Sequence, residues 1–398
     1  MVKFALIYSS SDSYWFSCRI IQANILKCLS LVSEEIVFQH FDFKEDEDLN
    51  TLSLKIIEGA ADEYFFLSHS PHPLEFIKNL KKNSSKKIIA TFLVYGGFIS
   101  SLGSWYEAFK LLKNDFLRII CASQAQERLI RKFIECSIHV IPFPVNEKIF
   151  YPSERSKQSR DKIKLIYAGR LSYEKNIQHL ILFLFKALDK GFFTSGFELS
   201  LAGYFDQLHR PLWGNDGVFG SYYFYLFNEI AEKVGQDRFK ESIKLLGPLN
   251  QEELKNNLDA SDIFVSLSSF SSEDYGMAAA EALEAGLPVI LSGWGGHHGF
   301  KKIYESRVNL VECEFQVEQV VPIYNSFEKA LINSLSNPHS NEPLQKLSIP
   351  EISVKYENFF VSNLRQNFIL KERFHEYVLV PKIDEERFKD LYEAYLIN

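Results

Sequence analysis

Two glutamates flank a glycine- and alanine-rich run in the second half of the chain. Glu273 and Glu281 lie in the segment 271–290, which reads SSEDYGMAAAEALEAGLPVI. The preceding run DIFVSLSS predicts a buried strand, and MAAAEALEAG predicts a helix that Gly286 closes as its C-terminal cap. Glu273 therefore stands in the turn before this helix, whereas Glu281 lies about one turn inside it.

The start of this predicted helix provides an anion site. Its first backbone amides, at Gly276, Met277 and Ala278, are free to bind a phosphate. Glu281 is placed to accept hydrogen bonds from ribose hydroxyls, and Glu273 would face a hexose on the other side of a diphosphate. The spacing thus suits one acid for each sugar of a sugar nucleotide. The plainer alternatives are a solvated helix residue for Glu281 and a favourable charge near a helix start for Glu273.

A pair of cations follows an earlier strand. The segment 166–176, IYAGRLSYEKN, ends a strand at Gly169, places Arg170 next, and puts Lys175 just before another helix. Glycine at a strand end allows a ligand to approach the backbone closely. Arg170 offers a fork of donors and Lys175 a point charge, so that together they can neutralise a diphosphate. The alternative is an ordinary loop with two solvated cations.

Two further strands also end in glycine. LAGYFD places Gly203 at a strand end, and LLGPLNQEEL places Gly247 and Pro248 there, with Asn250 as the N-cap of the next helix. One such glycine indicates only a turn. Several of them allow several backbones to approach one ligand.

The elements that carry these residues indicate an α/β protein of two doubly wound domains. Short, continuously apolar runs alternate with amphipathic stretches throughout, which is typical of parallel sheets covered on both faces. We predict a Rossmann-like domain at 1–150, a polar linker at 151–162 and a second Rossmann-like domain at 163–350. Helices at 351–398 are able to pack back on the first domain. Two such sheets facing each other would form a cleft beyond the ends of their strands.

Composition excludes several classes of protein. The net charge of −7 disfavours nucleic acid as a partner. The five cysteines are scattered without a C-x-x-C pair, so neither a disulfide framework nor a zinc site is indicated. No apolar run is long enough to span a bilayer. We expect a cytoplasmic protein that binds no metal and makes at most peripheral contact with the inner face of a membrane.

These motifs, in this order, resemble the C-terminal domain of retaining GT-B glycosyltransferases of the large family four, also called glycosyl transferases group 1. The resemblance covers roughly 164–296 and includes Glu-x7-Glu, GR-x4-K, LLG before EEL, and EALEAGLPVI. The segment HVIPFPVNEKIFYPSE is similar to the hinge of that family. The resemblance implies a GT-B fold, a nucleotide-diphospho-sugar donor as co-substrate, no cofactor, and metal-independent transfer with retention at the anomeric carbon.

The resemblance also implies roles for individual residues. Arg170 and Lys175 would bind the donor diphosphate together with the amides of residues 276–278, and Glu281 would bind the ribose. Glu273 would contact the donor sugar as a nucleophile or as a stabiliser of charge. The glycines at 169, 203 and 247, with Pro248, would line the donor site.

The N-terminal half departs from the family pattern at two places. Where the family has a Gly-Gly loop after the first strand, this chain reads YSSSDSYW, which offers the amides and hydroxyls of Ser10 and Ser11. Where the family often has a histidine after the fourth strand, Tyr95 and Gly96 stand instead. The residues His69 and His72, in LSHSPHP, are candidates for the polar roles in this acceptor half.

Two further segments have open interpretations. Residues 206–227 are rich in aromatics and glycine, and they either cover the donor, shape the acceptor site, hold a partner subunit or form an extra packed helix. The basic run at 78–87, KNLKKNSSKK, is either a solvated face or a contact for an anionic membrane or a lipid-diphosphate acceptor.

The sequence as a whole predicts a retaining glycosyltransferase that moves a sugar from a nucleotide-diphospho-sugar to a glycan or lipid-linked acceptor, in bacterial surface polysaccharide assembly. The alternatives are an inactive nucleotide-sugar or glycan-binding protein and a GT-B sugar-nucleotide epimerase. The sugar, the base, the acceptor and the oligomeric state are left open, because variable loops determine them.

Overall fold

A computed structural model shows two compact α/β units. It describes residues 2–9, 16–43, 48–59, 61–67, 72–83, 86–95, 98–153, 162–204, 219–270, 273–316, 319–336, 344–362, 366–378 and 385–396. The first unit contains Met1–Pro144 and Leu347–Tyr395, and the second contains Val145–Lys346 and Leu396–Asn398. Of the predicted linker at 151–162, residues 154–161 lie outside the described residues.

Six parallel strands form the sheet of the first unit. They are β1 (Val2–Tyr8), β2 (Ile36–Asp42), β3 (Glu63–Leu67), β4 (Ile89–Val94), β5 (Phe116–Cys121) and β7 (Ser137–Val140). Their order across the sheet is β2-β1-β3-β4-β5-β7. Every residue of β3 and β4 is buried, as expected of parallel strands with helices on both faces.

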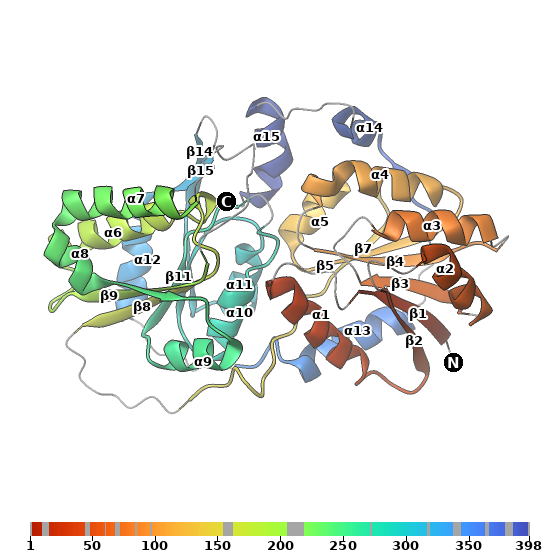
Figure 1. Ribbon diagram of the computed structural model, residues 1–398, viewed down its shortest axis with the longest axis horizontal. Coiled ribbons are helices and arrows are strands. Elements are labelled where there is room, and N and C mark those ends of the chain that lie inside the picture. The colour runs from red at the N-terminus through yellow and green to blue at the C-terminus, as the bar shows by residue number, and fades with distance from the viewer. Residues whose placement is uncertain are drawn as a thin grey trace. The chain divides into compact units, whose positions relative to one another are not determined.

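Helices from both ends of the chain belong to this first unit (Figure 1). The N-terminal segment supplies α1 (Phe16–Leu29), α2 (Leu49–Glu58), α3 (His72–Asn83), η1 (Ile99–Ser101), α4 (Leu102–Leu111) and α5 (Gln124–Arg131). The C-terminal segment supplies α13 (Ile349–Val361), α14 (Glu372–Val378), α15 (Glu385–Tyr392) and η3 (Glu393–Tyr395). A short antiparallel pair joins β6 (Ile134–Glu135) to β16 (Ile369–Leu370).

Aromatic packing attaches α13 to the first sheet. The ring of Phe360 lies 4.8 Å from that of Phe4, 5.1 Å from Phe38 and 5.5 Å from Phe65, in edge-on geometry in all three pairs. Such pairs add about 0.5–1.5 kcal/mol each beyond their buried area. Residues that follow the second unit in sequence are therefore part of the core of the first.

The second unit has its own six-stranded parallel sheet. Its strands are β8 (Ile163–Ala168), β9 (Phe197–Ala202), β10 (Ile243–Gly247), β11 (Ile263–Ser266), β12 (Val289–Ser292) and β13 (Val308–Val311). Their order is β10-β9-β8-β11-β12-β13. The direction of strand addition reverses between β8 and β11, and in open α/β sheets ligands bind beyond the strand ends at such a reversal.

The remaining elements of the second unit surround this sheet. They are η2 (Tyr173–Lys175), α6 (Ile177–Asp189), α7 (Phe219–Val234), α8 (Gln236–Ser242), α9 (Gln251–Asp259), α10 (Met277–Glu284), α11 (His297–Ile303), α12 (Tyr324–Ser336) and the hairpin of β14 (Cys313–Gln316) with β15 (Gln319–Pro322). Residues 206–218 of the aromatic-rich segment lie outside the described residues, and α7 begins directly after them.

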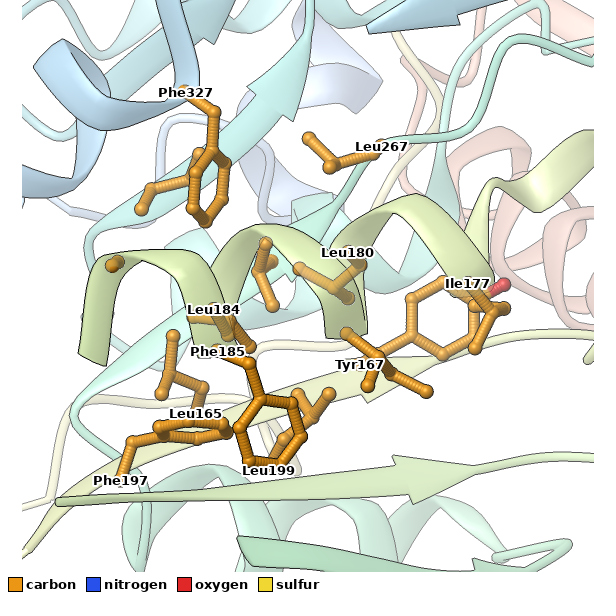
Figure 2. Close-up of a cluster of buried hydrophobic side chains, with 14 of the residues drawn as sticks. Leu165, Tyr167, Ile177, Leu180, Leu184, Phe185, Phe197, Leu199, Leu267 and Phe327 are labelled. Atoms are coloured by element: carbon orange, nitrogen blue, oxygen red, sulfur yellow. The ribbon is translucent and has the colours of Figure 1, made fainter. Parts of the chain in front are cut away.

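The core of the second unit lies between α6 and the sheet (Figure 2). Leu180, Leu184 and Phe185 of α6 are buried at helical spacing and belong to one cluster with Leu165 of β8 and Leu199 of β9. This packing fixes α6 on β8. The loop between them, which carries Arg170 and Lys175, is therefore held at both ends.

The described residues bear on two expectations from the sequence, one about membrane-spanning helices and one about disulfides. None of their helices combines the length and apolar content that crossing a bilayer requires. All five cysteines lie in described segments and are present as thiols.

A buried ion pair crosses the first sheet beneath α13. Arg118 of β5 contacts the carboxylate of Glu63 on β3, and its Nε donates to Oγ1 of Thr91 on β4 at 3.1 Å. The guanidinium lies 4.8 Å from the centre of the Phe359 ring. Both charged side chains are about 1–2% exposed, so each depends on the other for compensation.

Removal of one partner of this pair should destabilise the protein strongly. We expect Arg118→Met to lower the free energy of unfolding by about 3–5 kcal/mol, because Glu63 is left as a buried unpaired charge, whereas the double variant Arg118→Met/Glu63→Leu recovers most of it. Urea unfolding followed by circular dichroism measures both. Lys233→Met, which breaks an exposed pair on α7, is the control and should cost less than about 1 kcal/mol. Equal losses in the buried and exposed variants would contradict this account.

Candidate functional site

Glycines occupy the adjoining ends of β8, β9 and β10. Gly169 donates its N–H to Ala202 O at 2.9 Å, and Gly203 donates to Gly247 O at 2.8 Å. A Cβ atom at Gly203, where φ is 143°, would lie 1.8 Å from the carbonyl oxygen of Gly169. Only glycine fits there. The three backbones thus reach one edge of the sheet together, as the sequence predicts.

Arg170 leaves this edge and pairs with an acid of its own loop. Its guanidinium lies 3.2 Å from Oε1 of Glu174, which also accepts the hydroxyl of Ser172 at 2.8 Å. The same guanidinium lies 5.1 Å from the centre of the Phe270 ring. Arg170 is therefore held by an ion pair and by a cation–π contact.

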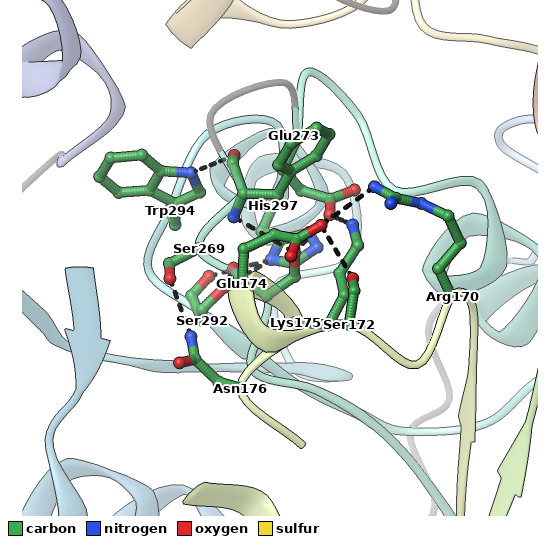
Figure 3. Close-up of polar contacts among 12 residues, drawn as sticks. Arg170, Ser172, Glu174, Lys175, Asn176, Ser269, Glu273, Ser292, Trp294 and His297 are labelled. Atoms are coloured by element: carbon green, nitrogen blue, oxygen red, sulfur yellow. Dashed lines mark hydrogen bonds and ion pairs between the residues drawn. The ribbon is translucent and has the colours of Figure 1, made fainter. Parts of the chain in front are cut away.

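Lys175 pairs with Glu273 across the reversal in strand order. Its Nζ contacts Oε2 of Glu273 (Figure 3). Ser268 donates its hydroxyl to the same oxygen at 2.5 Å. The Lys175 Nζ also lies 5.0 Å from the Phe270 ring, so one aromatic ring serves both cations. Lys175 follows β8 and Glu273 follows β11, and the pair therefore joins the two strands that flank the reversal.

The Lys175 contact keeps Glu273 ionised. Burial alone raises the pKa of this carboxyl, but the positive charge of Lys175 and the hydrogen bonds from Lys175 and Ser268 outweigh burial and lower the pKa to about 2. A carboxylate that stays charged in a buried place is suited to stabilise positive charge on a ligand.

Asn176 fixes the turn that presents Lys175. Its backbone is left-handed, with φ 55°, a conformation that asparagine tolerates. Its side-chain amide donates to Leu267 O and to Ser269 Oγ, both at 2.8 Å. The turn after β8 is thereby attached to the end of β11.

The glycine-rich loop after β12 supports Glu273 from the other side. Gly296 donates its N–H to Glu273 O at 2.8 Å, and Trp294 donates Nε1–H to Phe270 O at 2.7 Å. His297 is 1% exposed, and its Nδ1 lies 2.9 Å from Ser292 Oγ. Burial lowers the pKa of His297 to about 4, so the imidazole is neutral at pH 7.

The N-terminus of α10 lies between the two glutamates. Gly276, with φ 101°, is its N-cap, and a Cβ atom added to Gly276 would lie 3.0 Å from the ring of His297. The helix begins at Met277, and the first amides of any helix have no acceptor within it. Gly276 and Ala278 are partly exposed, so these amides are able to meet an anion.

Glu281 lies further along α10 in a different environment. It is 4% exposed, and Oε1 accepts no hydrogen bond from the described residues. Burial raises its pKa to about 8, and the side-chain amide of Gln251 at the start of α9 opposes this shift only in part. Glu281 is therefore protonated at pH 7 when the site is empty.

The structure brings Arg170, Lys175 and Glu273 together around Phe270, but it places Glu281 beside Gln251 instead. Arg170 pairs with Glu174 and Lys175 pairs with Glu273, so each of the two predicted phosphate-binding cations has a carboxylate partner in the protein. Pro248 is exposed after β10, and Asn250 caps α9 with a capping box to Glu253.

Sequence reasoning missed several supporting residues, namely Glu174, Gln251, Ser268, Phe270, Ser292 and His297. The sequence did contain a signal for Phe270. This aromatic residue directly follows the apolar strand DIFVSLSS, and it therefore stands at the strand end where a ligand is expected to bind. Among the described residues, no group of three or more histidine, cysteine, aspartate or glutamate side chains is arranged to hold a metal ion.

Most candidates in the first unit cannot be placed. Ser10, Ser11, His69 and Gly96 lie outside the described residues, and the side chain of His72, the first residue of α3, is not described. Tyr95 is buried after β4, where its ring packs edge-on against Phe143 at 5.8 Å.

Comparison with known proteins identifies the class of fold. A sucrose-phosphate synthase from Thermosynechococcus elongatus matches 91% of this chain and 99% of its own, with a TM-score of 0.59 at 16% identity. The Anabaena protein HepE, solved with UDP and glucose, matches 92% of this chain and all of its own, with a TM-score of 0.58 at 16% identity. The predicted fold class is confirmed: two Rossmann-like α/β domains of the GT-B type.

The sequence comparisons point to the same family. Residues 152–321 match the family model of glycosyl transferases group 1, so the predicted resemblance to that family is confirmed. An uncharacterized glycosyltransferase of Methanocaldococcus jannaschii is 28% identical over 187 residues, which are 47% of this chain. The match covers 41% of that relative's length.

The pKa of Glu281 predicts how stability depends on pH. The folded protein holds the proton up to about pH 8, whereas the unfolded chain releases it near 4.5, so Glu281 lowers stability progressively as the pH rises between these values. Glu281→Gln should therefore raise the melting temperature of the empty protein, with a gain that grows from pH 5 to pH 8 and then levels off.

Thermal melts of both proteins across this range provide the measurement. Glu252→Gln, an exposed change on the neighbouring helix α9, is the control and should leave the difference near zero at each pH. A gain that is independent of pH would show that Glu281 is not a buried acid with a raised pKa.

Proposed function

We propose that the protein is a retaining, metal-independent glycosyltransferase that uses a nucleotide-diphospho-sugar as donor and a glycan or lipid-linked molecule as acceptor. The observation that carries the proposal is the pair of glutamates on the two sides of the α10 N-terminus: Glu273 ionised beside Lys175, and Glu281 buried with an unpaired oxygen. The match of residues 152–321 to the family model of glycosyl transferases group 1 supports it.

The diphosphate would lie at the start of α10, between these acids. The amides of Gly276, Met277 and Ala278 provide fixed dipoles for the charge that develops as the nucleoside diphosphate departs. Arg170 is partly exposed and its partner Glu174 lies in the same loop, so we expect a phosphate oxygen to share or replace this contact. No cofactor is required in this scheme.

Glu273 would stabilise the sugar as the bond breaks. The bond from the anomeric carbon to the phosphate oxygen breaks as the acceptor oxygen attacks from the same face, and the acceptor proton passes to the departing phosphate oxygen. The anomeric carbon carries positive charge in between, and a carboxylate fixed by Lys175 and Ser268 opposes that charge without reorganisation.

The biological setting remains the one that the resemblance implies. We propose a role in the cytoplasm, in the assembly of a bacterial surface polysaccharide or glycolipid. The structure of HepE contains UDP and glucose, which makes UDP-sugars the first donors to test on this chain.

The charge of Glu273 should matter for turnover more than for binding. We expect Glu273→Gln to lower kcat about 100-fold or more and to change donor affinity by less than about fivefold, because the lost interaction acts mainly in the transition state. A thermal-shift panel of nucleotide sugars first identifies the donor, and release of nucleoside diphosphate then measures turnover with candidate acceptors.

The assay separates this proposal from its rivals. Glu252→Gln, on the exposed face of α9, controls for the loss of one acid and should keep full activity. Binding without turnover for any acceptor would favour a binding protein, and conversion of the donor without an acceptor would favour an epimerase. Unchanged kcat in Glu273→Gln would refute the role of its charge.

A further inference from the structure

A cavity of about 630 Å³ lies beside the outer edge of the first sheet. Its walls are β6 and β7 on one side and the chain from Gln366 to Ile369 on the other, and all of them belong to the first unit. Small-molecule sites typically have volumes of about 300–1,000 Å³. The polar residues that line the cavity are Arg131, Glu135, Ser137, His139, Gln366 and Asn367.

The cavity is separate from the candidate site of the second unit and from the acceptor residues predicted in the first. It extends along the edge from Glu135, before β7 begins, whereas the predicted acceptor residues follow β1, β3 and β4 at their carboxyl ends. Tyr95, the one of them with a described side chain, does not line it. No role has therefore been given to this cavity by the sequence.

The cavity exists because a strand pairing stops early. β16 pairs with β6 at Ile369 and Leu370, but residues 366–368 form no strand and leave the edge of β7 uncovered by any described strand. Ile141 donates its N–H to Cys121 O of β5 at 2.9 Å. Since backbone groups alternate along a strand, Ile138 directs its N–H and C=O away from β5, toward the free edge.

Two polar side chains of β7 are held in place on one face of the sheet. Ser137 Oγ lies 3.0 Å from His139 Nε2, and the His139 ring packs edge-on against Phe359 of α13 at 4.8 Å. Burial, followed by the positive charge of Arg118, lowers the pKa of His139, so the imidazole is neutral at pH 7. A neutral imidazole offers one donor and one acceptor nitrogen.

The exposed wall of the cavity carries two carboxamides. Gln366 and Asn367 are both exposed, and neither side chain hydrogen-bonds to a described residue. Each carboxamide offers two donor hydrogens and an acceptor oxygen in one plane. Ile369 follows them and is 62% exposed, so the wall also has an apolar surface.

The ionised residues that line the cavity balance each other. Arg131 is positive and lies 2.9 Å from Glu127 on its own helix, an exposed pair of the kind that contributes little to stability. Glu135 is negative, exposed and without an ion pair among the described residues. The lining therefore has one charge of each sign, which gives no excess for an anion or a cation.

This mixture of groups selects a ligand that donates and accepts at many points. A phosphate or carboxylate only accepts, so it would leave Glu135 and the carboxamide oxygens unmatched, and an ammonium only donates. A hydroxyl group does both. A ring with several neighbouring hydroxyls and an apolar C–H face meets the polar groups and Ile369 together, and such a ring is a neutral sugar.

We propose that the cavity between β7 and residues 366–369 is a second carbohydrate site, which binds a short neutral stretch of a glycan through the carboxamides of Gln366 and Asn367 and the Ser137–His139 pair. The inference deepens the proposed function, because the view of this glycan as part of the acceptor or product rests on it. The cavity would hold sugars other than the one that reacts.

Binding of neutral trisaccharides to the full chain tests the proposal. The probes are maltotriose, cellotriose, mannotriose, galactotriose and chitotriose, measured by calorimetry and by saturation-transfer NMR without any nucleotide. We expect at least one to bind with a dissociation constant of about 1 mM or lower. Gln366→Ala and Asn367→Ala should each weaken this binding about fivefold or more, because each removes hydrogen bonds to the sugar.

A matched variant and two further measurements serve as controls. Gln124→Ala removes an exposed carboxamide at the far end of α5 from Arg131 and should leave trisaccharide affinity unchanged. Gln366 and Asn367 are exposed, so their variants should keep the wild-type melting temperature. The thermal shift that nucleotide sugars produce should also be the same in all three variants, because the donor residues lie in the second unit.

Several outcomes would overturn the inference. They are failure of all five trisaccharides to bind, binding that Gln366→Ala and Asn367→Ala leave unchanged, and inorganic phosphate as the ligand that these variants weaken. If nucleotide sugars still bind, these results leave the proposed function intact. Trisaccharide binding that depends on Gln366 and Asn367, in a protein that binds no nucleotide sugar, would instead overturn the proposed function and leave the carbohydrate site standing.

Discussion

The ion pair of Lys175 and Glu273 is the interaction on which the rest of the site depends. It joins the loop after β8 to the loop after β11, the two strands between which the order of the sheet reverses. A single buried charge at this place would be costly, but each partner compensates the other, and Ser268 and Phe270 complete their surroundings. The same contact that holds two loops together also keeps a carboxylate ionised at the strand ends.

Burial has the opposite effect on the second acid, Glu281. Glu281 has no cation to pair with, so burial raises its pKa, and its unpaired oxygen is retained at a cost in stability. Its helix is otherwise well stabilised, with apolar residues buried along α10 and Gly286 closing the C-terminus at φ 85°. The protein therefore carries the destabilising Glu281 carboxyl on a well-packed helix, which is typical of a binding site whose polar groups are satisfied by a ligand.

The sequence predicted the elements well because their signals are local. Apolar runs alternating with amphipathic stretches indicated both parallel sheets, and Asn250 and Gly286 were recognisable as caps. The partners of the site residues were not predictable in this way. Glu174 neutralises Arg170 and Gln251 faces Glu281, and both contacts depend on how loops from different strands meet. Likewise, the sequence showed that Gly203 ends a strand, as several other glycines do, but not why the residue must be glycine. The reason is that the carbonyl of Gly169 lies where a side chain would begin, and only the folded sheet brings the two residues close.

The most direct measurement is a crystal structure of the protein with a bound nucleotide sugar. This account predicts a diphosphate within hydrogen-bond distance of the amides of Gly276–Ala278, the ribose hydroxyls on Glu281 and the hexose facing Glu273, with Lys175 still in contact with that carboxylate. A nucleotide bound away from the start of α10, or with both sugars on the same side of that helix end, would contradict it.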